Sequence, residues 1–250
     1  MKIDKLICAP VRTGFFFDDQ KAIKEGAEPD GFTYCGEPKT PGFSRLRQAG
    51  EGVSILLQLE DGSLAYGDCV AVQYSGVDGR DHLFQAAPAI EVIERVVKPW
   101  LEGREITTFR EMAAEADQMT DAMTGRRLHT AIRYGVTQAL LDAVAHARHQ
   151  LMVEVIADEY GLEPLTKPVP ILTQSGDERY LNADKMILKG VDALPHGLFN
   201  HVETKLGPRG EKLLAYVDWL TRRIDKLKPT PSYQPIIHLD LSGTAGLAFD

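Results

Sequence analysis

Five residues of this sequence combine a reactive or ligand-binding side chain with a position that suits a site: Asp240, His196, Gln174, Lys205 and Gln73. Asp240 follows directly on a short apolar run, where a carboxylate is costly to bury unless it binds a cation or accepts hydrogen bonds. Two functions fit it equally, a ligand for a hard metal ion or a cap for the loop at 242–244. The metal-using function is the one that would make this chain an enzyme.

The other four residues each allow a chemical and a structural interpretation. The amide of Gln174 both donates and accepts hydrogen bonds, which suits a substrate carboxylate or amine, but a loop-forming function fits its position better. His196 can transfer a proton near neutral pH, although a single histidine is more often structural. A desolvated Lys205 would be a base, and a surface or ion-paired lysine is the favoured alternative. Gln73 is either a substrate contact or a satisfied turn residue.

These side chains need elements to position them, and the sequence beyond residue 165 predicts alternating strands and helices. Apolar runs predict three strands, and apolar spacings of three and four residues predict two helices between them: strands at 168–172, 200–206 and 235–241, and helices ending near 189 and 227. This order implies right-handed parallel crossovers. Because ligands bind at the carboxyl ends of parallel strands, we expect Gln174 and Asp240 at one edge of the sheet.

The first part of the chain predicts an α+β domain. A strand near Leu6 precedes a Gly- and Pro-rich segment at 14–50, whose length and aromatic content predict a loop that covers a site. Alternating runs joined by Asp61-Gly62 predict a hairpin, and apolar stripes predict helices: strands at 53–59 and 64–72, and helices at 86–100, from 108, and at 128–149. Thr108 and Glu111 have the spacing of a capping box.

Composition excludes several classes of protein. The 250 residues carry a net charge of −8, with 44% hydrophobic and 26% charged residues, which is typical of a soluble globular chain. The acidic balance argues against a nucleic-acid surface, and no apolar run is long enough for a membrane span or a secretory signal. Three widely spaced cysteines, Cys8, Cys35 and Cys69, favour reduced thiols in the cytoplasm. Dinucleotide, phosphate-loop and zinc motifs are absent from the sequence.

A more specific signal comes from segments that occur in order along the whole chain. They are residues 14–20 (GFFFDDQ), 67–69 (GDC), 72–76 (VQYSG), 103–110 (GREITTFR), 128–135 (LHTAIRYG), 174–177 (QSGD), 194–196 (LPH) and 238–240 (HLD). Together they closely resemble the methylaspartate ammonia-lyase family of the enolase superfamily. The resemblance implies an α/β fold: an α+β capping domain over residues 1–165, then the first part of an enolase-type (β/α)8 (TIM) barrel over 166–250.

The resemblance also implies a carbon–nitrogen lyase reaction. The family eliminates ammonia from L-threo-3-methylaspartate to give mesaconate in glutamate fermentation, and Mg²⁺ stabilises the enolate-like dianion. By position, Asp240 matches the first of three carboxylate metal ligands, and His196 matches the histidine opposite the main base. Gln174 and Gln73 match substrate-binding glutamines, whereas the resemblance gives Lys205 no function.

The family pattern continues beyond this sequence, which ends after the third predicted barrel strand. Two further carboxylate ligands and the catalytic lysine are absent from residues 1–250, and three strands cannot close a barrel. We therefore expect a piece of a longer protein or a truncated product, inactive by itself. The full-length protein is expected to be a cytoplasmic homodimer that acts on a small amino acid with Mg²⁺, with a monovalent cation such as K⁺ also allowed. Another enolase-superfamily lyase or racemase of carboxylates, or a non-catalytic remnant, are the alternatives.

Overall fold

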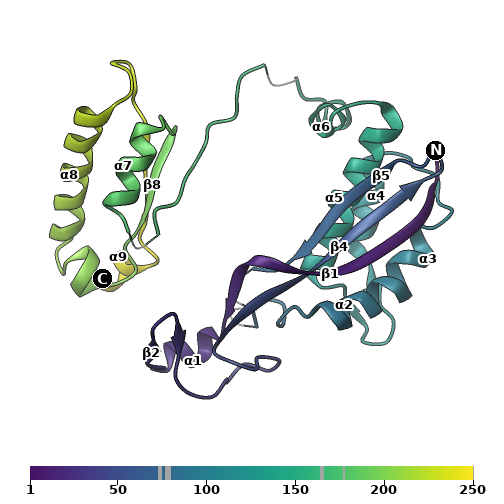
Figure 1. Ribbon diagram of the computed structural model, residues 1–250, viewed down its shortest axis with the longest axis horizontal. Helices are drawn as coiled ribbons and strands as arrows, with labels where there is room; N and C mark the ends of the chain where they lie inside the picture. Colours follow the sequence, from purple (N-terminus) through teal and green to yellow (C-terminus); the bar gives the residue numbers. More distant parts are fainter. Residues whose placement is uncertain (73–74, 77–79, 164–165, 177, 250) are drawn as a thin grey trace. The chain divides into compact units, whose positions relative to one another are not determined.

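The computed structural model describes residues 1–72, 75–76, 80–163, 166–176 and 178–249. The chain forms two compact units, Met1–Pro164 and Leu165–Asp250 (Figure 1). Both units mix helices and strands, so the predicted α/β class is confirmed at this level.

An antiparallel sheet forms the centre of the first unit. β4 (Arg47–Leu59) lies between β1 (Ile3–Asp18) and β5 (Leu64–Val70). Gly62, with a φ of +85°, makes the tight turn between β4 and β5, because a left-handed backbone costs glycine nothing. The hairpin predicted around Asp61-Gly62 is confirmed, although β4 begins earlier than the sequence pattern indicates.

The segment predicted as a covering loop contains regular structure. Residues 14–18 belong to β1, and the segment continues as short elements: α1 (Gln20–Lys24), β2 (Pro29–Asp30) and β3 (Thr33–Tyr34). Buried Asp19 caps α1 and accepts hydrogen bonds from the backbone N–H groups of Lys39 and Thr40 at 2.6 and 2.9 Å. Burial raises the pKa of Asp19, but the hydrogen bonds from Thr40, Lys39 and Ala22 outweigh it and lower this pKa below its ordinary value.

Helices and one short hairpin complete the first unit. They are α2 (Ala86–Val92), a π-helical turn (Ile93–Val97), α3 (Lys98–Leu101), α4 (Phe109–Gln118), β6 (Thr120–Asp121) with β7 (Arg126–Arg127), α5 (Thr130–Arg148) and α6 (Met152–Tyr160). The Thr108 hydroxyl accepts a hydrogen bond from the Glu111 N–H at 3.3 Å, so the predicted start of α4 is confirmed. The apolar stripe predicted at 86–100 is helical too, but a π-helical turn interrupts it.

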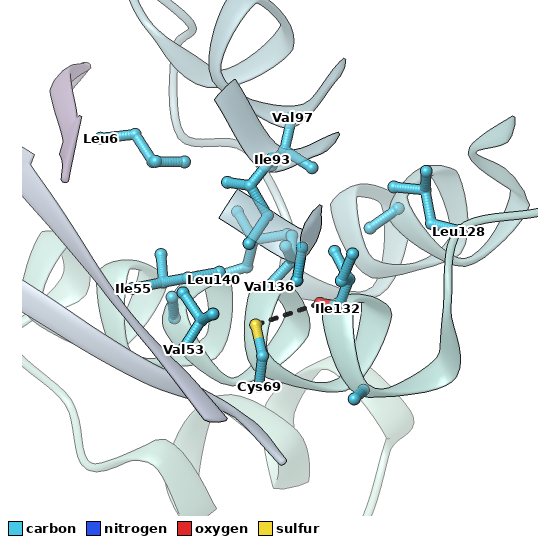
Figure 2. Close-up of a cluster of buried hydrophobic side chains, with 14 of the residues drawn as sticks. Leu6, Val53, Ile55, Cys69, Ile93, Val97, Leu128, Ile132, Val136 and Leu140 are labelled. Atoms are coloured by element: carbon cyan, nitrogen blue, oxygen red, sulfur yellow. Dashed lines mark hydrogen bonds between the residues drawn. The ribbon is translucent and has the colours of Figure 1, made fainter. Parts of the chain in front are cut away.

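The first unit depends on a close approach of α5 to β5, which places Leu140, Val136 and Ile132 against the buried face of the sheet (Figure 2). Glycines at positions 67 and 135 make this approach sterically allowed. A Cβ on Gly67 would lie 2.0 Å from the Gly135 carbonyl oxygen, and a Cβ on Gly135 would lie 2.5 Å from the Cys69 sulfur. Burial raises the pKa of the Cys69 thiol, which therefore stays protonated and packs as an apolar group.

The described part of the second unit contains two parallel strands, three α-helices and a π-helical turn. Its elements are α7 (Leu181–Leu188), β8 (Ala193–Leu198), a π-helical turn (Val202–Leu206), α8 (Glu211–Leu227), β9 (Ile236–Asp240) and α9 (Thr244–Phe249). β8 and β9 run parallel, and isolated parallel bridges join Leu172 to Ala193 and Gly176 to Gly197 on the other side of β8. The third predicted strand and both predicted helices are confirmed.

The strand predicted at 200–206 is wrong. The strand lies earlier, at Ala193–Leu198, and Val202–Leu206 forms a π-helical turn. Hydrogen bonds to the backbone on both sides decide the strand position: Thr173 N–H donates to Ala193 O on one side, and Ile236 N–H donates to Asp192 O on the other. His196 therefore lies inside a strand, and Lys205 does not lie at the end of one.

We predict that Gly135→Ala lowers the free energy of unfolding by about 1–3 kcal/mol, because the new methyl group overpacks the contact with Cys69. Intrinsic helix propensity alone would give the opposite sign, a gain of about 1 kcal/mol. Urea denaturation of the protein measures the change. Gly14→Ala is the matched control, since nothing lies within 4 Å of a Cβ there. A stabilised Gly135→Ala variant would contradict the tight approach.

Candidate functional site

Two histidines and a carboxylate meet where β8 and β9 end. In the parallel register Pro195 lies opposite His238 and Gly197 lies opposite Leu239, so His196 is an extra residue in β8 without a partner in β9. The φ of His196 is +48°, a left-handed conformation that is strained for a residue with a side chain. A bulge of this kind re-aims a side chain, and here it brings His196 beside His238.

The distances within this group define a compact polar site. The Nδ1 atoms of His196 and His238 lie 2.9 Å apart, and the two rings are nearly parallel, with centroids 4.8 Å apart at an interplanar angle of 12°. The Nε2 atom of His196 lies 3.7 Å from Oδ2 of Asp240. The side chains of His196 and Asp240 are 24% and 35% exposed, so a small molecule can reach both.

Asp240 does cap the loop that follows it. Its Oδ1 accepts hydrogen bonds from the Ser242 N–H at 2.8 Å and from the Ser242 hydroxyl at 3.1 Å. Its Oδ2 is the oxygen that faces His196. The two interpretations of Asp240 are therefore compatible, because one oxygen holds the loop and orients the carboxylate while the other remains available for a ligand.

Thr244 ties the ends of the two strands together. Its buried hydroxyl lies 2.7 Å from the Phe199 carbonyl oxygen, just after β8, and 2.6 Å from the Leu241 carbonyl oxygen, just after β9. The Phe199 N–H in turn donates to the Asp240 carbonyl oxygen at 2.7 Å. These bonds fix the backbone on which the Asp240 carboxylate is placed.

The remaining predicted residues differ in their surroundings. Gln174 lies in the segment beside β8, where the neighbouring Ser175 N–H donates to Pro195 O at 2.7 Å, so its backbone is at the predicted edge. Lys205 donates a hydrogen bond from Nζ to Asn200 Oδ1 at 2.7 Å on the surface, which agrees with the structural alternative. Gln73 lies outside the described residues.

His238 joins this site without having been predicted as a site residue, although the sequence contains a signal for it. His238 and Asp240 are two residues apart in a strand, and the period of two puts them on the same face. The run that precedes Asp240 is apolar apart from His238, and the structure leaves this histidine of β9 exposed.

The first unit contains a mostly apolar cavity of about 720 Å³. Phe15, Val70, Val72, Ser75 and Tyr134 are among the residues that line it. His129 borders the same cavity and is fixed, since its Nδ1 accepts from the Ala131 N–H and its Nε2 lies 3.0 Å from His82 O. Burial is the main cause that lowers the pKa of His129, so a neutral ring is favoured.

The described residues do not form a complete metal site. Among them, no three His, Cys, Asp or Glu side chains gather in a way that could hold a metal ion. A hard divalent cation prefers several oxygen ligands, of which Asp240 Oδ2 offers one. A search of the described helices also finds none that is long and apolar enough to cross a membrane.

Both parts of the chain match models of a single family. Residues 1–161 match the model described as methylaspartate ammonia-lyase N-terminus, and residues 164–250 match the model described as methylaspartate ammonia-lyase C-terminus. The chain belongs to the methylaspartate ammonia-lyase family. The resemblance found in the sequence is thereby confirmed.

Solved structures of methylaspartate ammonia-lyases agree closely with the chain. The Mg complex of beta-methylaspartase from Clostridium tetanomorphum is 58% identical with a TM-score of 0.96, and the alignment covers 100% of this chain and 60% of that one. The Citrobacter amalonaticus methylaspartate ammonia-lyase containing (2S,3S)-3-methylaspartic acid is 52% identical, with the same TM-score and coverage. The chain therefore spans about 60% of the length of these family members.

More distant structures share the fold alone. A dipeptide epimerase from Methylococcus capsulatus, complexed with Mg and a dipeptide, is 16% identical with a TM-score of 0.58. That alignment covers 98% of this chain and 55% of the epimerase. The likeness extends over both units of the chain and supports the mixed α/β class.

We predict that Thr244→Val lowers the free energy of unfolding by about 1–2 kcal/mol, because a buried carbonyl oxygen loses its hydroxyl partner while side-chain volume is kept. Thr244→Ser restores the hydroxyl and is expected to recover most of the loss. Chemical denaturation of the three proteins measures the effect. A loss in Thr244→Ser with none in Thr244→Val would show that the methyl group of Thr244, not its hydroxyl, matters.

Proposed function

We propose that the protein containing this chain eliminates ammonia from L-threo-3-methylaspartate to give mesaconate. The observation that carries the proposal is the pairing of His196 with Asp240 at the ends of β8 and β9, within a chain that matches the methylaspartate ammonia-lyase family along its length. The Citrobacter amalonaticus relative supports the substrate, since its structure contains (2S,3S)-3-methylaspartic acid. The enzyme class would be a carbon–nitrogen lyase.

Each unit would contribute residues that bind the substrate. In this proposal the first unit is the capping domain, and Gln73 contacts the substrate. The second unit is the first part of the (β/α)8 barrel, in which β9 is the third strand. Gln174, whose backbone lies beside β8, would bind a substrate carboxylate or the amino group through its amide.

Asp240 would be one ligand of Mg²⁺, as the Mg complex of the Clostridium tetanomorphum relative supports. Its donor chemistry fits, because Oδ2 is a hard, partly exposed oxygen that the loop-capping bonds leave available. When bound, Mg²⁺ supplies electrostatic stabilisation of the negative charge that develops on a substrate carboxylate. The described residues provide a single ligand of the three implied by the family, so residues 1–250 are expected to need the rest of the family's chain.

The histidine would exchange the proton on the carbon next to the carboxylate. In the elimination a base takes the C3 proton, the C2–N bond breaks, ammonia leaves, and the electron pair forms the C2–C3 double bond. The family places a lysine on one face of that carbon and the counterpart of His196 on the other. His196 would therefore serve the erythro diastereomer, in which the proton lies on its face.

We also propose that the full-length protein is a cytoplasmic homodimer, which can bind a monovalent cation such as K⁺ in addition to Mg²⁺. The acidic composition and the three free thiols support the cytoplasm. No nucleic acid or membrane is proposed as a partner.

The full-length protein with Mg²⁺ is expected to convert 3-methylaspartate to mesaconate, because the chain contains the first metal ligand and the acid/base histidine of the family. The conjugated double bond of the product gives a new ultraviolet absorbance that measures the rate. Residues 1–250 alone serve as the control and are expected to show no turnover. Absence of turnover by the metal-loaded full-length protein would refute the substrate assignment, and turnover by residues 1–250 would show that the site is misplaced.

Asp240→Asn in the full-length protein is expected to weaken Mg²⁺ binding at least about tenfold, since the amide keeps the size and polarity but removes the charge that a hard cation prefers. Isothermal titration with Mg²⁺ measures the affinity. Asp142→Asn, at a partly exposed carboxylate of α5, is the matched control and is expected to leave the affinity unchanged. Unchanged Mg²⁺ affinity in Asp240→Asn would leave Asp240 with its loop-capping function alone.

A further inference from the structure

His238 has a contact that the proposed reaction does not use. Its Nδ1 lies 2.9 Å from Nδ1 of His196, within hydrogen-bond range, and the two rings are nearly parallel. The parallel register places His238 opposite Pro195, next to the bulged residue. The left-handed backbone of His196 would be an unnecessary strain if the direction of its side chain were unimportant.

The two Nδ1 atoms restrict the protons of both rings. A hydrogen bond needs one donor and one acceptor, so one ring must carry a proton on Nδ1 and the other must present a lone pair there. With Nδ1 of His196 engaged, its Nε2 is the nitrogen that remains for exchange with a substrate. That atom faces Asp240 Oδ2 at 3.7 Å, which is too long for a hydrogen bond.

We propose that His238 is the positioning residue of His196: its Nδ1 accepts the Nδ1–H of His196, which holds the ring in place and leaves Nε2 free for the substrate proton. The inference rests on the proposed function, in which His196 exchanges a proton on one face of the substrate carbon. It explains why the imidazole of His238 lies on the same strand face as Asp240, two residues earlier. Orientation of an acid/base histidine through its second nitrogen is a frequent arrangement in active sites.

Two substitutions of His238 distinguish the effect of its hydrogen bond to His196 from the effect of its ring packing against His196. His238→Phe keeps a flat ring against His196 but removes the acceptor, whereas His238→Asn keeps an acceptor near the position of Nδ1. In the full-length protein with Mg²⁺, His238→Phe is expected to lower kcat for the erythro diastereomer at least about tenfold and to leave KM nearly unchanged. Turnover of the threo substrate should stay within about threefold, and His238→Asn should recover most of the erythro rate. His146→Phe, at an exposed histidine of α5, is the matched control.

A second measurement does not depend on turnover. Nitrogen NMR of histidine-labelled full-length protein, with the His196 signal assigned from His196→Ala, reports which ring nitrogen carries the proton. The wild type is expected to show a single Nδ1–H form of His196, and His238→Phe is expected to show a mixture of both forms. The wild type could also turn over neither diastereomer and still show only the Nδ1–H form of His196. That result would refute the proposed function but would support the hydrogen bond between His196 and His238.

Other outcomes would overturn the positioning function. If His238→Phe lowers both diastereomer rates equally together with the melting temperature, His238 is a packing residue. If the rates do not change, the contact has no part in the reaction. If His196 shows the same mixture of protonated forms in the wild type and in His238→Phe, the hydrogen bond that carries the inference does not exist.

Discussion

The site depends on one extra residue in β8. Parallel strands pair with an even spacing, so without the bulge the residue after Pro195 would take the place opposite Leu239, and its side chain would alternate to the other face. Because of the bulge, Gly197 lies opposite Leu239 and the His196 ring lies beside His238. The same pairing ends with Leu198 opposite Asp240, so the ring and the carboxylate come to the same edge. The Thr244 hydroxyl near the Phe199 carbonyl oxygen and the hydrogen bond from the Ser242 N–H to Asp240 then hold the ends of β8 and β9 in place.

Much of this arrangement could be predicted from the sequence, because the spacing of apolar residues and the residue types of turns and helix caps are local properties. The hairpin at Gly62, the cap at Thr108 and the amphipathic helix α8 follow from a few neighbouring residues. The carboxylate at the end of an apolar run was also sufficient to identify Asp240. Family resemblance, rather than spacing, was needed to propose a proton-transfer function for His196.

The parts that could not be predicted depend on contacts between segments distant in sequence. β8 contains Pro195 and Gly197, residues that weaken a strand by propensity, and it forms because segments on both sides supply hydrogen bonds. The better strand former, Val202–Leu206, pairs with no strand among the described residues and forms a π-helical turn instead. His238 was overlooked for the same reason, since its importance comes from a ring that is 42 residues earlier in the chain.

The close approach of α5 to β5 limits how this unit can evolve. A side chain at position 67 would meet the backbone of α5, and a backbone oxygen cannot be exchanged for a smaller group. No compensating substitution elsewhere can relieve that collision, so a lineage can leave this state only by moving the whole helix and repacking every side chain beneath it. Any residue other than glycine at position 67 therefore requires α5 to lie farther from β5 than it does in this fold.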